Sequence, residues 1–150
     1  MITSIKLTFY KMEKSFMNRS SAQEWLTKAW HHLSSAQILF QADHYADIIG
    51  VELHYAIEIT LKSLLAYDNR QIKKTHELFE IYSQINLKND LDEEEVRILL
   101  IATKYHILEA YPSPHRKLPD TKEIEKVLNF SLNLFSIVCI QLDINPLDCQ

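Results

Sequence analysis

The chain has 150 residues, of which 47% are hydrophobic and 24% are charged, and its formal net charge is −4. This length and composition are typical of one soluble globular domain with its own core. The negative balance argues against a protein that binds nucleic acid through a global basic surface. Gly50 is the only glycine, and because sheets and tight hairpins usually need glycine, we expect an all-α protein.

The beginning of the chain has only weak patterning, so we expect residues 1–20 to form a loosely structured N-terminal arm. It lacks the apolar core of a signal peptide, and no apolar run in the chain reaches the length of a membrane span, so we expect a cytoplasmic protein without a membrane partner. Ser21, with Glu24 one turn later, predicts the cap of a first helix that runs to about Gln41. The compact domain is therefore expected over residues 21–150.

A second helix is predicted over residues 46–67, and it carries two apolar strips instead of one. Leu53, Ile57 and Leu61 belong to one strip. We therefore expect this helix to be central, with neighbours on most sides and with Gly50 at the close approach of another helix. The strip left for solvent is narrow and consists of Glu52, Ala56, Thr60 and Ser63.

Three further helices are predicted, the first of them short. Capping residues indicate where each begins, and a run with three prolines over residues 112–119 ends the second of them. The expected fold is an antiparallel up-and-down bundle of four long helices plus one short helix. The predicted limits are Thr75 (cap) and Ile85, Asp92 (cap, with Glu95) and Ala110, and Asp120 (cap, with Glu123) and Leu142.

Three titratable residues follow one another at one-turn spacing in the second helix: His54, Glu58 and Lys62. One interpretation is a local Glu58–Lys62 pair, worth roughly 0.2–0.5 kcal/mol if exposed, with His54 bonded to Glu58. The other is a groove that binds a ligand, because a buried carboxylate needs good partners and such buried charges are often functional. The spacing alone leaves both interpretations open.

Two motifs in and after this helix resemble the HEPN domain family. They are "HYAIEITLKSLLAY" at residues 54–67 and "KKTHEL" at residues 73–78, and Tyr111-Pro112 is a third match. The resemblance extends over about residues 22–142. It implies a HEPN-type helical bundle that commonly forms homodimers. It also implies a role in nucleotide or RNA chemistry, often beside a small nucleotidyltransferase partner in a toxin–antitoxin or defence setting.

The resemblance also implies which residues line a nucleotide- or RNA-binding site. His54 is expected to brace Glu58 from behind the site. The positions that match the family motifs are Glu58, Lys62, Lys74, Thr75, His76 and Tyr111.

The chain departs from the ribonuclease members of the family. Those members use an arginine and a histidine about four to six residues apart on a late helix, to stabilise phosphate charge and to move a proton. Here the spacing occurs only from Arg70 to His76, across the connector after the second helix, and Ala110 precedes Tyr111 where many relatives have arginine. We therefore expect a binding role and weak or absent RNA cleavage. The alternatives are a metal-independent ribonuclease toxin and a catalytically inactive scaffold or interaction module.

No cofactor and no metal site are predicted. His54 and Glu58 have a spacing that suits two ligands on one helix, but two ligands do not complete a site. Cys139 and Cys149 lack metal-ligand spacing and form no disulfide framework, so we expect reduced thiols.

A homodimer is expected from the resemblance and from apolar residues of the last helix. Phe130, Leu134 and Ile137 add apolar surface beyond what one core of this size requires. We predict that this surface is covered by a second copy of the chain.

Overall fold

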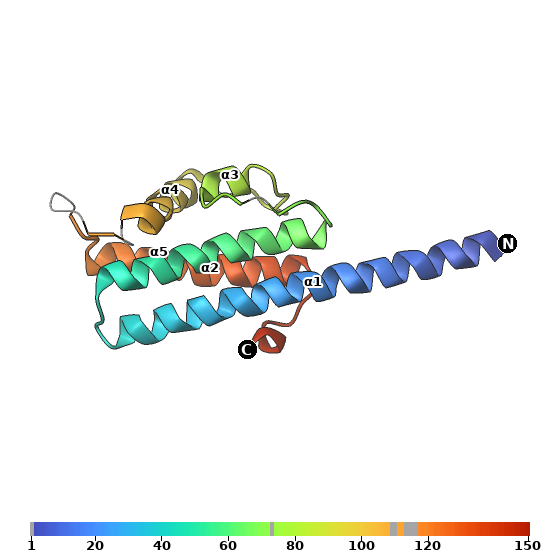
Figure 1. Cartoon of the computed structure of the whole chain (residues 1–150), viewed down its shortest axis with the longest axis horizontal. Helices are drawn as coiled ribbons and strands as arrows, with labels where there is room; N and C mark the ends of the chain where they lie inside the picture. The colour runs from blue at the N-terminus through green and yellow to red at the C-terminus, as the bar shows by residue number, and fades with distance from the viewer. Residues whose placement is uncertain (1, 73, 109–110, 113–116) are drawn as a thin grey trace.

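The computed structural model describes residues 2–72, 74–108, 111–112 and 117–150. The regular secondary structure of these residues is helical throughout, without a strand, so the predicted all-α bundle is confirmed (Figure 1). None of the helices in these ranges is long and apolar enough to cross a membrane. The helices are α1 (Ile2–Gln41), α2 (Ala46–Tyr67), α3 (Leu78–Tyr82), α4 (Glu93–Leu108), α5 (Thr121–Gln141) and the 3-10 turn η1 (Pro146–Cys149).

Helix α2 lies at the centre of the bundle, as predicted. It contacts α1, α3, α4 and α5, and in Figure 1 it runs between α1 and the layer formed by α3 and α4. A Cβ atom on Gly50 would lie 3.1 Å from Cγ of Tyr105 in α4. The prediction that another helix approaches Gly50 closely is therefore confirmed.

The solvent strip predicted for α2 is wrong. Ala56, Thr60 and Ser63 have exposed fractions of 1%, 2% and 0%. Their small side chains let neighbouring helices approach, and the two hydroxyls donate to carbonyls of the same helix, Thr60 to Ala56 and Ser63 to Thr60. Only Glu52 of the predicted strip keeps partial exposure, and it binds Nδ1 of His32 at 2.8 Å.

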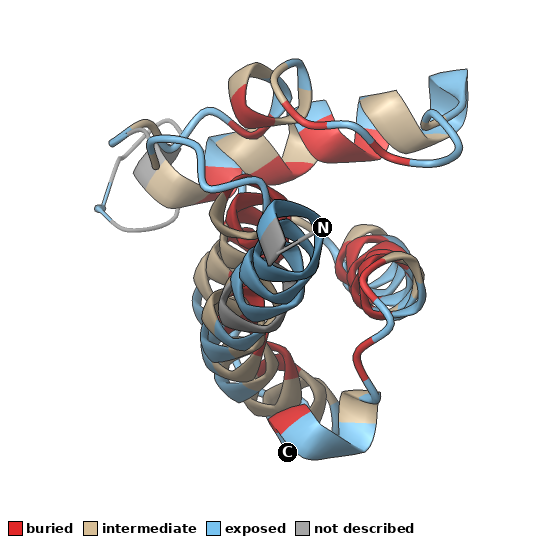
Figure 2. Ribbon diagram, turned by 90° about the vertical axis from the view of Figure 1, so that its right-hand side faces the viewer, coloured by how far each residue is buried: buried red, intermediate tan, exposed pale blue. Residues whose placement is uncertain are grey.

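The beginning of the chain also differs from the prediction. Helix α1 is continuous from Ile2 to Gln41, so the arm is helical instead of loosely structured, and Ser21 lies inside the helix and does not cap it. No proline or glycine occurs in this stretch, so nothing local interrupts the helix. Residues 2–14 project beyond the bundle and are exposed where their side chains are described (Figures 1 and 2). The division of the chain at residue 20 stays a prediction.

The caps predicted for the two later long helices are present. In α4, Glu95 N donates to Asp92 Oδ1 at 2.8 Å and Asp92 N donates to Glu95 Oε1 at 3.1 Å, which is a complete capping box. In α5, Asp120 accepts from Glu123 N at 2.8 Å. Glu123 does not close that box, because its carboxylate accepts a hydrogen bond from the Tyr105 hydroxyl.

Three long helices end without glycine, which explains how a chain with one glycine forms this bundle. Two positions after the last residues of α1, α2 and α5 are Asp43, Asn69 and Asp143, with φ angles of 53°, 53° and 55°. Asp and Asn enter this left-handed region more readily than other residues with a side chain. Each therefore takes the left-handed position after a helix that glycine usually occupies.

Helix α3 is shorter than predicted, and the prediction that Thr75 caps it is wrong, because the N-cap position is Glu77. The Thr75 hydroxyl accepts from Glu77 N at 3.1 Å and donates to Glu80 Oε2 at 3.0 Å. Residues 74–77 precede the helix. They form a segment that contacts the side of α2. The position of this segment determines the site described below.

Two of the residues predicted to contact a dimer partner belong to the core. Phe130 and Leu134 have exposed fractions of 6% and 1%, and Ile137 is partly buried against the same core. Helix α5 contacts α1, α2 and α4, so the packing of the single chain already covers this surface. The homodimer itself stays a prediction.

The two cysteines are free and buried. Burial raises the pKa of the Cys139 thiol to about 12, and burial also raises the pKa of Cys149. These thiols are therefore protonated packing groups that hold η1 against α5 and α1.

Candidate functional site

The three polar residues predicted along α2 lie in the core, not on a solvent face. His54, Glu58 and Lys62 have exposed fractions of 0%, 5% and 6%. Lys62 Nζ lies 3.2 Å from Glu58 Oε2, so the two charges form a buried pair one turn apart. A buried ion pair is costly to form unless further hydrogen bonds stabilise it. The second oxygen of the Glu58 carboxylate receives such a bond.

His76 binds the other oxygen of Glu58. Its Nδ1 lies 2.7 Å from Glu58 Oε1. A carboxylate accepts hydrogen bonds, so Nδ1 of His76 carries the proton and donates. The segment of residues 74–77 thus closes over α2, and Glu58 joins Lys62 to His76.

His54 secures the same segment through its backbone. Its Nε2 lies 2.9 Å from the carbonyl oxygen of His76, and because a carbonyl only accepts, Nε2 is the donor. Nδ1 of His54 is 3.9 Å from Glu58 Oε1, which is too long for a hydrogen bond. His54 therefore makes no direct hydrogen bond to Glu58, and it supports Glu58 only through the segment that carries His76; its role behind the site stays a prediction.

This arrangement keeps His54 neutral. Burial lowers the pKa of His54 to about 4, although the bond to the His76 backbone and the charge of Glu58 act in the opposite direction. Nδ1 is buried without a hydrogen-bond partner among the described residues. His54 is therefore an uncharged support of the site and not a source of positive charge.

Sequence reasoning missed a third imidazole, His106 of α4. Its ring stacks on His76 with a centroid distance of 4.0 Å and an interplanar angle of 19°, and it lies 4.9 Å from the ring of His54. Burial, followed by the proximity of His76, lowers the pKa of His106. The sequence contains one weak signal, because the apolar residues Leu99 and Ala102 precede His106 by two turns and one turn and place it on the same face of the helix. We call His54, Glu58, Lys62, His76 and His106 the imidazole cluster.

The remaining predicted site residues lie outside the imidazole cluster. Thr75 is bonded to the start of α3, Lys74 is exposed beside His76 in the chain, and Tyr111 is 72% exposed in the segment after α4. The structure thus brings together Glu58, Lys62, His54 and His76 of the predicted set. Lys73, Glu109, Ala110, His115 and Arg116 lie outside the described residues.

Arg70 and His76 do not form a joint pair. The Arg70 guanidinium donates to the carbonyl oxygen of Gln84 beyond α3, whereas the His76 ring binds Glu58. Across the residues that the structure describes, no group of three His, Cys, Asp or Glu side chains could hold a metal ion.

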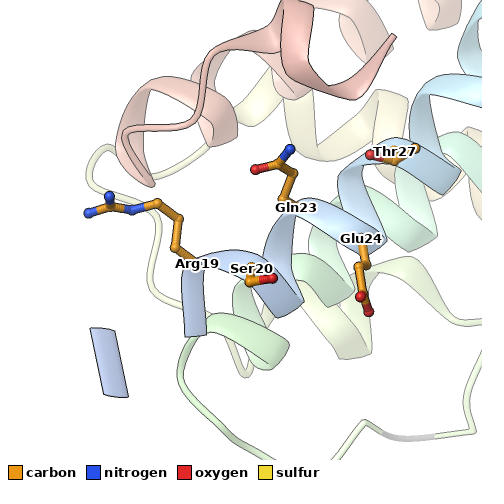
Figure 3. A pocket seen from close by; sticks show the side chains of 5 residues that line it. All are labelled: Arg19, Ser20, Gln23, Glu24 and Thr27. Carbon is orange, nitrogen blue, oxygen red and sulfur yellow. The ribbon is translucent and has the colours of Figure 1, made fainter. Parts of the chain in front are cut away.

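A separate hollow lies on α1, and none of the predicted site residues lines it. It has a volume of about 410 Å³. In Figure 3 the Arg19 side chain points away from the others that line it, and the Glu24 carboxylate opposes binding of an anion. The hollow therefore indicates no particular ligand. Its described lining is Arg19, Ser20, Gln23, Glu24 and Thr27.

Comparison with known proteins gives two matches that agree in extent. Residues 22–141 match the family model of the HEPN domain. The crystal structure of TT1696 from Thermus thermophilus is similar to this chain with a TM-score of 0.68 and 26% sequence identity, over 81% of this chain and 97% of that one. No functionally curated protein matches the chain.

Proposed function

Since this chain belongs to the HEPN domain family, we propose that it binds the phosphate of a nucleotide or RNA at the imidazole cluster. We also propose that it acts as a homodimer beside a small nucleotidyltransferase partner, in a toxin–antitoxin or defence setting and in the cytoplasm. These roles extend what the family resemblance implies for this chain. The binding role has additional support in the arrangement of His76.

The single observation that carries the binding proposal is the state of the His76 ring. Its Nδ1 is held by Glu58 at 2.7 Å, yet 49% of the side chain is exposed. Nε2 makes no hydrogen bond within the described part of the chain. A ring that is oriented by a buried carboxylate and accessible at its opposite edge is arranged to meet a ligand.

One exposed lysine lies close to this edge in the chain. Lys74 is exposed two positions before His76 in the same extended segment, and Lys62 lies behind Glu58 at 3.2 Å. Glu58 thus neutralises Lys62 and orients His76, while Lys74 is left to contact a phosphate. This division of roles predicts that Lys74 affects binding and that Glu58 affects stability.

A binding role fits the structure better than RNA cleavage by the ribonuclease alternative. Arg70, which has the required spacing from His76, is engaged by the Gln84 carbonyl. We expect the purified protein to cleave RNA poorly or not at all. A catalytically inactive binding module that contacts the nucleotidyltransferase remains the second candidate, and the same arginine geometry favours it.

The test is titration calorimetry of the purified protein with AMP and with a short RNA. The Lys74→Ala substitution should weaken binding by about tenfold, the loss of one charge-assisted phosphate contact, without changing the free energy of unfolding. Lys88→Ala, which changes an exposed lysine of a different connector, is the matched control and should bind as the unmodified protein does. Absence of binding to both ligands, or equal binding by Lys74→Ala, would contradict the proposal.

A further inference from the structure

We propose that the stacked His76–His106 pair takes up a proton when the site binds a dianionic phosphate, so that the preferred ligand is a phosphate monoester and not an internal RNA diester. The monoester belongs either to a free nucleotide or to the phosphorylated end of an RNA. This inference rests on the proposed binding function and adds to it the chemical class of the ligand.

The two rings of the pair are stacked and come from different parts of the chain. The two rings are nearly parallel at 19° with centroids 4.0 Å apart, and they come from the 74–77 segment and from α4. Glu58 holds one ring nitrogen of His76. His106 contacts His54 and Tyr55 of α2 at centroid distances of 4.9 and 5.9 Å. Both rings are therefore fixed by α2, and each has a ring nitrogen that makes no hydrogen bond within the described part of the chain.

The charged groups of α2 that face the pair cancel one another. Glu58 and Lys62 have opposite charges 3.2 Å apart and cancel. His54 is neutral near pH 7, because burial lowers its pKa to about 4, and Tyr55 contributes an aromatic ring. Helix α2 therefore presents no net charge to an anion.

The 74–77 segment and α1 add little net charge near the pair. In the 74–77 segment, Lys74 and Glu77 are both exposed and of opposite charge. From α1, His32 reaches the site only through its ring contact with Tyr55 at 5.3 Å, and it is engaged by Glu52. A ligand with two negative charges thus needs positive charge in addition to that of Lys74, and among the described side chains of this site the stacked His76–His106 pair can supply it.

The two stacked rings affect each other's protonation. Two imidazolium ions in contact repel each other, so the pair resists holding two protons while no anion is present. A bound dianion offsets this repulsion and favours proton uptake, whereas a diester with one negative charge offsets it less. Linkage then requires that protonation of the pair strengthens binding of the dianion.

Inorganic sulfate is the first probe, because it stays a dianion between pH 6 and 8 and any pH dependence belongs to the protein. Calorimetric titration should show affinity that rises by about fivefold to tenfold for each unit that the pH falls, as expected for uptake of up to about one proton. Titration in Tris and in HEPES, whose ionisation enthalpies differ, should show the same uptake directly. Affinity that is independent of pH would overturn the inference.

Variants then assign the proton to the pair. His106→Phe keeps a ring to stack on His76 but cannot titrate, and it should reduce the pH dependence to less than about twofold per unit. His106→Gln should do the same and provides a second variant if the first does not fold. His44→Gln changes an exposed histidine of the α1–α2 turn and should leave the pH dependence intact. An unchanged pH dependence in both His106 variants would contradict the assignment.

Nucleotide ligands separate this inference from the proposed function. AMP and a 5′-phosphorylated RNA trimer should bind with proton uptake, and the unphosphorylated trimer should bind at least about tenfold more weakly. If AMP binds without proton uptake, or if the unphosphorylated RNA binds equally well, the inference is wrong and the binding function stands. If neither AMP nor RNA binds at any pH, the binding function and this inference both fail.

Discussion

Two acid–base pairs with the same helical spacing lie in opposite environments of this molecule. Glu58 and Lys62 in α2 are 3.2 Å apart with 7% of each side chain exposed. Glu93 and Arg97 in α4 are 2.9 Å apart with 88% and 58% exposed. Both pairs have the acid one turn before the base, so the sequence pattern is the same. Burial, and not the distance between the charges, decides what each pair does.

The exposed pair is part of a solvated group at the start of α4. Arg97 also binds Glu94, which Lys126 of α5 contacts at 3.2 Å. The hydrogen bond from Lys126 and then that from Arg97 hold the pKa of Glu94 below its usual range. Water and salt screen such pairs, so each contributes little to stability. The buried pair has no such screening, and the loss of either partner leaves a charge in the core.

The largest expected difference follows from removing the acid of each pair. Glu58→Ala should lower the free energy of unfolding by about 3 kcal/mol or more, because it leaves Lys62 buried without its carboxylate and releases His76. Glu93→Ala should lower it by less than about 0.5 kcal/mol. Chemical denaturation of both variants measures the contrast.

Equal and small changes in the free energy of unfolding for the two substitutions would contradict this prediction. They would mean that α2 opens enough for water to reach Lys62 and that the pair is only a local helical contact. High salt provides a further control, since it should reduce the small effect at Glu93 and leave the large one at Glu58.

The second prediction compares a buried and an exposed histidine. The pKa of His54 in the folded protein is about 4, below the ordinary value of 6.5. Between these values the unfolded chain binds a proton that the folded chain does not, so stability falls as the pH decreases. This single group should remove about 2 kcal/mol of stability between pH 7 and pH 4.5.

Substitution of His54 tests that prediction. His54→Gln keeps a donor for the His76 carbonyl but cannot titrate, so its stability should fall less steeply with pH, by about the amount given above. His44→Gln, at an exposed position, should retain the full pH dependence. Parallel profiles of stability against pH for the unmodified protein and His54→Gln would show that protonation of His54 in the folded protein costs no stability.

The same contrast explains what could be predicted from the sequence. The order of the helices, the central position of α2 and the capping box at Asp92 depend on local patterns, and these predictions are confirmed. The predicted solvent strip of α2 is wrong because helical periodicity does not reveal that Thr60 and Ser63 satisfy their hydroxyls within the helix. His106 was missed because its importance depends on the crossing of α4 over α2, which is a long-range contact. The identity of His76 as the partner of Glu58 is long-range too, and only the family motif indicated it.

The smallest prediction compares two capping patterns of the same type. Asp92→Ala at the start of α4 should cost about 1 kcal/mol, because it removes the acceptor of Glu95 N. Ser21→Ala should be neutral or stabilise the protein by about 0.5 kcal/mol, because Ser21 lies inside α1 and alanine is the better helix former. Thermal unfolding of both variants gives the comparison. A loss at Ser21 as large as that at Asp92 would restore the predicted helix start.

The unbroken length of α1 affects how the particle moves through a solution. With 40 residues and a rise of 1.5 Å per residue, the helix is about 60 Å long, whereas a compact chain of this size has a radius of gyration of about 15 Å. The projecting end in Figure 1 increases friction more than it increases mass. A single copy should therefore elute from a gel-filtration column ahead of a compact protein of 17.6 kDa. Early elution would therefore not show a homodimer, and sedimentation equilibrium is the measurement that counts copies.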